Sequence, residues 1–183
     1  MLKLPLLSLL LSASLLSEEI PQNIIDTGEK VSKELLKQLG PKLKHEMKTN
    51  GPVAAAKFCH ENAYILTEEV NLHQLEGVSV KRISLQERNP ANEPSATEKK
   101  VLEQMHSLHK EKKLPAYLIE KEEKNYKYYK PLVINKPVCL KCHGDLSKDP
   151  ELSAFMKEHY PLDKAVNYKM NDLRGAIVVE IKQ

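Results

Sequence analysis

Hydrophobic residues recur at helical spacing in the first part of the chain. Between residues 23 and 48, apolar side chains return every four positions, which is the spacing of one face of an α-helix. These positions are Val31, Leu35, Leu39, Leu43 and Met47. Gly40-Pro41 falls inside the segment, and because proline lacks a backbone N–H we expect a kink or a break there.

A second helix is predicted immediately afterwards. Asn50-Gly51 ends the first helix, and Pro52 suits a first helical turn, where a missing N–H costs no hydrogen bond. We expect this second helix to run to about Leu66. Its inner face carries Ala55, Cys59, Ala63 and Leu66.

Alternating patterns follow, and they predict strands. Residues 78–84 alternate between two faces, a proline-containing loop spans 88–94, and Ser95 with Glu98 has the sequence of a capping box that opens a third helix. Three further strands are predicted, the first two as a hairpin, at residues 116–122, 126–134 and 175–181. These elements predict an α+β domain, in which helices pack on a small antiparallel sheet.

Composition and charge narrow the classes of function. The 183 residues are enough for one domain, and 41% hydrophobic with 29% charged residues is a globular balance. The formal net charge is +3, and lysines alternate with glutamates along most of the chain. We expect no nucleic-acid partner, because this charge pattern contains no stripe suited to tracking phosphates.

The N-terminal segment differs from everything after it. Lys3 gives a positive start, an apolar stretch runs from Leu4 to Leu16, and the acidic pair Glu18-Glu19 follows. This layout predicts a secretory signal peptide at residues 1–17 and one domain over residues 18–183. We therefore expect an exported, periplasmic protein. The alternative is an uncleaved segment, which would be the protein's link to a membrane.

One short motif carries recognisable chemistry. Cys139-Leu140-Lys141-Cys142-His143 has the pattern C-x-x-C-H, the attachment signature of c-type haem. Each thiol adds across one vinyl group of the porphyrin, and two intervening residues set the separation of the two sulfurs. His143 then offers an imidazole nitrogen to the iron as an axial ligand. The motif predicts one covalently attached haem c.

Two other chemistries use closely spaced cysteines. A zinc ribbon needs a second pair of ligands, for which only Cys59 and scattered histidines remain. A thioredoxin-like dithiol needs a helix N-terminus in a parallel βαβ unit, which the predicted elements do not contain. The three cysteines are also an odd number for a disulfide framework in an exported protein, so haem is the favoured interpretation.

Several segments together resemble the family of single-haem c-type cytochromes and haem-sensor domains with a PAS-like fold. They are Ala54–Ala63, Val80–Ser84, Arg88–Pro94, Pro131–Asp145 and Tyr168–Ala176. The resemblance implies a PAS-like α+β fold and a cysteine from an N-terminal helix as second axial ligand of the iron. Asn167 and Asn171 stand where the family usually has glycine. Because Asn tolerates left-handed backbone, we expect that loop to keep its turn.

The resemblance makes Cys59 the expected second axial ligand. From the residues alone, Cys59 is equally a small buried side chain, although Ala55 and Ala63 beside it would let a flat ring approach the helix. His60 points about 100° away around the helix. An open site and other side chains remain as alternatives: Met47, Met105, Met156, Met170, His106, His109 and His159. Of these, Met47 and Met105 are predicted as core, and the three histidines as solvent-exposed.

Arginines and tyrosines supply the remaining candidates. Arg82, Arg88 and Arg174 suit the haem propionates, because a guanidinium binds a carboxylate through two parallel hydrogen bonds. The alternative is that they are ordinary surface arginines. Tyr117 and Tyr168 either pack on the ring or fill the core.

Three functions are consistent with this site. A redox or small-ligand sensor comes first, because a cysteine ligand that leaves the iron on reduction would open a position for a small gas molecule. A periplasmic electron carrier is the alternative. A haem enzyme comes last, since two filled axial positions leave no place for substrate. The sensor and the carrier each need a signalling or redox partner protein.

Overall fold

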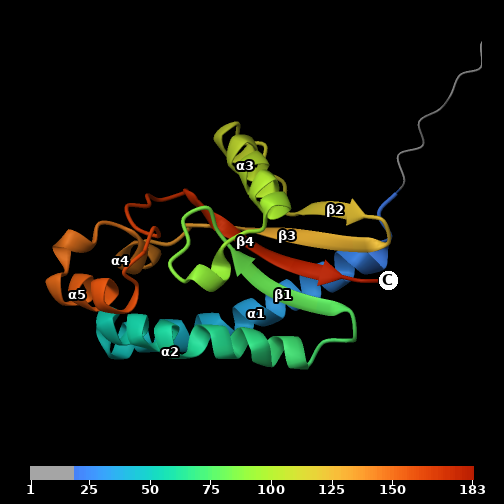
Figure 1. Ribbon diagram of the computed structural model, residues 1–183. Helices are drawn as coiled ribbons and strands as arrows, with labels where there is room; N and C mark the ends of the chain where they lie inside the picture. The colour runs from blue at the N-terminus through green and yellow to red at the C-terminus, as the bar shows by residue number, and fades with distance from the viewer. Residues whose placement is uncertain (1–18) are drawn as a thin grey trace, which may run out of the picture.

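The computed structural model describes residues 19–183, in which helices flank one sheet (Figure 1). The signal peptide predicted at residues 1–17 lies outside the described residues. Within the described chain, four strands pair in the order β1-β4-β3-β2, each pair antiparallel. They are β1 (Val78–Ile83), β2 (Leu118–Glu122), β3 (Asn125–Val133) and β4 (Leu173–Ile181). The predicted α+β class and hairpin are confirmed.

Two long N-terminal helices pack against each other, and each of them continues beyond the residue at which the sequence predicted a break or an end. Helix α1 (Gln22–Thr49) is continuous through Pro41, so of the predicted kink or break the break does not occur. Lys37, whose carbonyl loses its helical partner at Pro41, is exposed, and water can bind that carbonyl. Helix α2 (Gly51–Leu72) continues beyond Leu66. Thr67 and Val70 extend its buried face, and no glycine or proline interrupts it.

Helix α1 lies across one face of the sheet and contacts β3 and β4 (Figure 1). Gly28 permits this close approach, because a Cβ at that position would overlap the ring of Tyr128. Tyr117 stacks on Tyr128 with 5.1 Å between ring centroids, so it belongs to this core. The core residues on this face include Ile24, Val31, Leu35, Val80, Tyr126, Tyr128, Ile177 and Val179.

Helix α3 (Ala96–Lys110) covers the other face of the sheet (Figure 1). The predicted capping box is present: the Ser95 hydroxyl accepts from the backbone N–H of Glu98, and the Glu98 carboxylate accepts from that of Ser95. Met105 is fully buried in a core cluster with Tyr129 and Val178, which confirms the prediction that it belongs to the core.

The segment between β3 and β4 forms two helices that hydrophobic periodicity did not reveal. Helix α4 (Cys139–His143) is a single turn, and α5 (Pro150–His159) follows it beside α2. The start signal of α5 is local: Asp149 accepts from the N–H of Leu152 at 3.1 Å, and Pro150 occupies the first turn. Two 3₁₀ turns, Pro90–Asn92 and Leu146–Lys148, complete the connections. Among residues 19–183, no helix is long and apolar enough to cross a bilayer.

Candidate functional site

A largely apolar cavity of about 680 Å³ lies where β3 leaves the sheet. This volume falls within the range of about 300–1,000 Å³ that ligand and cofactor sites occupy. Side chains from α1, α2, α4 and α5 and from the chain after β3 line it, among them Leu43, Met47, Ala55, Ala56, Ile134, Val138 and Met156. Met47 therefore borders a cavity and is only half-buried, so its prediction as core is wrong.

The C-x-x-C-H motif forms one wall of this cavity. Cys139, Cys142 and His143 all line it, because residues three and four apart share one face of a helical turn. The backbone N–H of Cys139 donates to the carbonyl of Lys136 at 3.0 Å, and the N–H of Gly144 donates to that of Leu140 at 2.9 Å. The strands around the motif are antiparallel, which differs from the parallel unit of a thioredoxin-like dithiol.

His143 is held in one orientation by its backbone surroundings. Its Nδ1 lies 3.0 Å from the carbonyl oxygen of Ala165, so a neutral ring donates from Nδ1 and keeps the lone pair of Nε2 free. Burial, with Arg174 and Arg88 nearby, lowers the pKa of His143 to about 3. The imidazole is therefore neutral at physiological pH, and the neutral form is the one that binds metals.

The loop before β4 is joined to the motif by backbone hydrogen bonds. The N–H groups of Asn167 and Tyr168 donate to the carbonyls of Gly144 and His143 at 3.0 and 2.9 Å. Asn167 and Asn171 have φ angles of 62° and 70°, so the expected left-handed turns are confirmed. The Tyr168 ring lies edge-on to the ring of His143, with 6.1 Å between centroids. These asparagines therefore keep a loop conformation that supports the histidine.

A buried ion pair supports the same histidine from a third segment. The Arg88 guanidinium Nε lies 2.9 Å from an Asp163 carboxylate oxygen, and both side chains are nearly buried, at 13% and 9% exposed. Nη2 of Arg88 donates to the carbonyls of Cys142 at 2.6 Å and Ala165 at 3.1 Å. Asp163 also accepts from the N–H of Ala165 at 2.8 Å. The Ala165 carbonyl, which accepts from Nδ1 of His143, is thus itself held in place. The sequence did not predict these contacts.

Cys59 faces the same cavity from α2. It lines the large cavity together with the C-x-x-C-H side chains, and it also lines an adjoining smaller cavity of about 210 Å³. Burial raises the pKa of the Cys59 thiol, and the positive charges of Arg82 and Arg88 partly oppose this shift. Burial likewise raises the pKa of Cys142 to about 11. The fold therefore brings all three cysteines and His143 to one cavity.

The other ligand candidates lie elsewhere, with two exceptions. Met47 and Met156 both line the large cavity, and of the two only Met156 is buried. His60 packs against the ring of His159, with 4.7 Å between centroids, and against Phe155 and Tyr160. The remaining candidates are His106 and His109 around a different cavity, Met105 in the α3 core, and Met170 at the surface. The histidines predicted as exposed are only partly so, because His106, His109 and His159 are each half-buried.

The three predicted arginines all meet at this site, and they differ in the donors they keep free. Arg88 uses three donor contacts on protein groups. Arg174 donates to the Gln86 carbonyl at 2.9 Å and lies 5.3 Å from the centroid of the Tyr168 ring. Arg82 donates to the Ala63 carbonyl at 3.2 Å, and its buried Nε has no partner among the described residues. Arg82 therefore keeps an unused buried donor beside the smaller cavity.

Comparisons with known proteins agree with this architecture. No curated protein sequence matches the chain. The crystal structure of the cyanobacterial haem protein Tll0287 superposes with a TM-score of 0.63 at 24% sequence identity, covering 90% of this chain and 98% of the other. The two proteins therefore share a fold. The Tll0287-like family model matches residues 14–182, and this chain belongs to the Tll0287-like family.

Proposed function

We propose that this protein is a single-haem c-type cytochrome that acts as a haem-based redox or small-ligand sensor. One observation carries the proposal: Cys139, Cys142, His143 and Cys59 all face one largely apolar cavity of cofactor size. The similar crystal structure is that of a haem protein, which supports the same cofactor. With Cys59 and His143 both directed at this space, we propose no enzymatic role.

The residues present fit haem. The apolar walls suit a porphyrin, the neutral His143 suits an axial ligand, and the unused Nε–H of Arg82 suits a propionate. When bound, the haem supplies a one-electron redox centre and an iron that takes small ligands. In this proposal Cys139 and Cys142 hold it through thioether bonds, His143 and Cys59 are the axial ligands, and Arg82 and Arg174 bind the propionates.

Arg88 and Asp163 have a different task in this proposal. Their ion pair fixes the Ala165 carbonyl, and that carbonyl accepts from Nδ1 of His143. A hydrogen bond at one ring nitrogen sets the tautomer, the ring orientation and the basicity of the other nitrogen. Arg88 is therefore a positioning residue for His143, rather than a propionate ligand.

We also propose that the protein is exported, with residues 1–17 as its signal peptide. Thioether attachment suits a periplasmic protein, because a covalently bound cofactor is not lost by dissociation. The test is cell fractionation of the full chain, followed by the mass of the mature N-terminus. Cytoplasmic retention of the haem-loaded protein would contradict export and leave the haem proposal intact.

The haem proposal is tested by mass and spectra. Expression of the full chain in a host that attaches haem c should give a denatured mass larger by one haem, and its absence would overturn the proposal. Cys59→Ala should change the ferric absorption spectrum, whereas Met170→Ala, at a surface position, should not. An unchanged Cys59→Ala spectrum would eliminate Cys59 as a ligand.

A periplasmic electron carrier is the second candidate, favoured by exposed lysines at the mouth of the cavity. Reduced protein with and without carbon monoxide separates the two functions. Ligand binding after reduction supports the sensor, because it requires Cys59 to leave the iron. A spectrum unaffected by carbon monoxide supports the carrier.

A further inference from the structure

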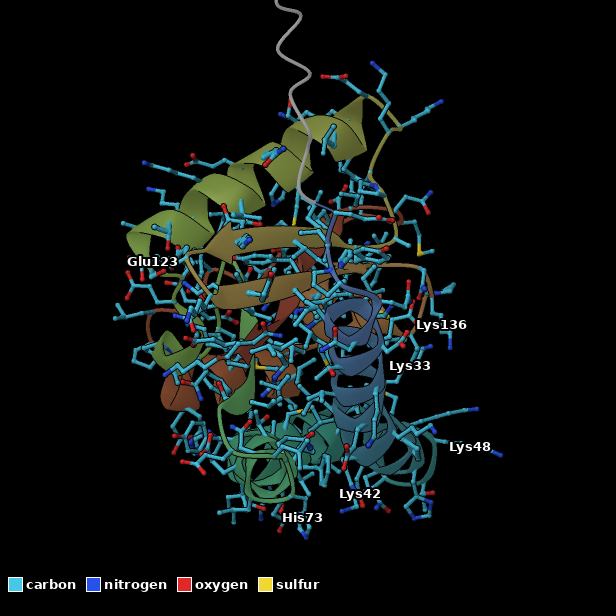
Figure 2. All side chains as sticks on the ribbon, turned by 90° about the vertical axis from the view of Figure 1, so that its right-hand side faces the viewer. Lys33, Lys42, Lys48, His73, Glu123 and Lys136 are labelled. Atoms are coloured by element: carbon cyan, nitrogen blue, oxygen red, sulfur yellow. The ribbon has the colours of Figure 1, made fainter. Side chains whose placement is uncertain are left out.

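The rim of the large cavity is basic. Lys44 from α1 and Lys136 from the chain after β3 line it on two sides. Lys37 and Lys48 lie on the same stripe of α1 as Lys44, at helical spacings of seven and four residues. All four are exposed, and Figure 2 shows Lys48 and Lys136 extending into solvent on the same side of the molecule. We call these four lysines the lysine rim.

The charge of the lysine rim is not neutralised locally. None of its four lysines has an ion-pair partner within the part of the chain that the structure describes. Glu46, the acidic residue of this part of α1, lies about 200° around the helix from Lys44 and binds the Asn50 side chain at 2.7 Å. Four lysines without an ion pair in the described chain thus lie around one face of a protein whose formal net charge is +3.

Apolar side chains lie inside this rim. Leu36 and Val138 both line the cavity, yet they are 40% and 45% exposed. An apolar centre surrounded by charge is the composition of a protein docking surface. The surrounding charge steers a partner of opposite sign and sets the orientation of the complex.

We propose that the lysine rim docks an acidic electron-transfer protein over the mouth of the haem cavity. The inference rests on the proposed function, and it supplies the partner's chemistry. In the complex one electron passes from the partner's reduced centre to the ferric iron, so the partner is oxidised and the iron is reduced, with no bond or proton transferred. A second copy of this chain that presents the same face would meet the rim with like charge. An anionic membrane is a less suitable partner, because α1 is packed along α2 and is not a free amphipathic helix.

The test measures binding of the haem-loaded full chain to an acidic plant-type [2Fe–2S] ferredoxin by calorimetry at low ionic strength. The rim variant is Lys44→Glu with Lys136→Glu. The control is Lys99→Glu with Lys124→Glu, which changes the net charge equally at exposed positions on α3 and in the β2–β3 turn, outside the cavity lining. We expect the rim variant to bind at least about tenfold more weakly, the control to stay within about threefold of the natural protein, and salt to weaken binding.

Equal weakening by both variants, or binding insensitive to salt, would overturn the inference. Absence of a ferredoxin complex would overturn it too, and co-sedimentation with phosphatidylserine vesicles in that case would identify a membrane as the rim's target. Each preparation is first shown to carry one haem by mass. A preparation without haem contradicts the proposed function, whereas a haem-loaded protein that does not bind contradicts only the docking surface.

Discussion

The two halves of α1 carry the same apolar pattern and meet different surroundings. In the N-terminal half, Ile24, Val31 and Leu35 are buried against the sheet. In the C-terminal half, Leu43 and Met47 continue that face but line a cavity. The change occurs where β3 ends after its irregularity at Leu132 and Val133, so the sheet no longer covers the helix. Periodicity predicts which face of a helix is apolar, and the length of its neighbours decides what covers that face.

The comparison explains how a site arises next to an ordinary core. The sheet fills the space against one half of α1, and the bound cofactor is proposed to fill the space against the other half. Binding to the folded state alone stabilises that state by mass action. The C-terminal half should therefore depend on the cofactor, while the N-terminal half should not.

The largest expected effect comes from removing both attachment thiols, Cys139→Ala with Cys142→Ala. Covalent haem should be lost completely, because no second thioether pair is available. Amide hydrogen exchange should then rise at least about tenfold over residues 43–49 and stay unchanged over residues 24–35, since only the former lose their packing partner. The measurement is mass-resolved hydrogen exchange on the natural protein and on the double variant. Equal rises in the two halves of α1 would show that the cofactor does not distinguish them.

The next largest effect is expected at the buried ion pair between Arg88 and Asp163, beside the cavity. Arg88→Met should cost about 3–5 kcal/mol of unfolding free energy, because it leaves the Asp163 carboxylate buried without its partner. Replacing both, Arg88→Met with Asp163→Leu, should recover much of that loss. Urea unfolding monitored by circular dichroism measures both. A cost below about 1 kcal/mol for Arg88→Met would show that the pair is solvated and does not position His143.

Matched truncations on α1 sharpen the comparison directly. Leu35→Ala should cost about 2–5 kcal/mol, because Leu35 is fully buried and its loss leaves a void. Leu43→Ala, measured in the haem-free Cys139→Ala/Cys142→Ala background, should cost less than about 1 kcal/mol, since its side chain already borders open space. Equal costs would mean that the cavity closes without cofactor. Urea unfolding of each truncation and of its own parent protein measures the two costs.

A single-site effect of about 1 kcal/mol is expected on α3, away from both halves of α1. Burial alone would raise the pKa of Glu98, but hydrogen bonds from Lys81 and Ser95 outweigh it and hold the pKa below its usual 4.5. A lowered folded pKa adds stability above the unfolded pKa, and that stability is lost as pH falls through the folded value. Glu98→Gln should therefore cost about 1 kcal/mol at pH 7, and this difference should shrink as pH falls from 4.5 through the lower pKa of the folded state. Thermal unfolding against pH measures it, and a constant difference would contradict it.

Much of the fold could be predicted because its determinants are local. The capping box at Ser95, the hairpin strands and the turns at Asn167 and Asn171 each depend on a few consecutive residues. Two local features were not predicted. Helix α1 stays continuous through Pro41, next to an exposed part of the helix, and helix α5 begins at a cap at Asp149 within a weakly periodic segment.

For the site, the sequence by itself determined the C-x-x-C-H motif, since the spacing of two thiols and an imidazole is set within one helical turn. It also supplied Cys59 and three arginines as candidates. Only the tertiary structure decided that Cys59 faces the same cavity as His143, that Arg88 pairs with Asp163, and that Lys136 lines the same cavity as α1. The physical reason is that these contacts join distant segments, and chain topology rather than local spacing brings them together.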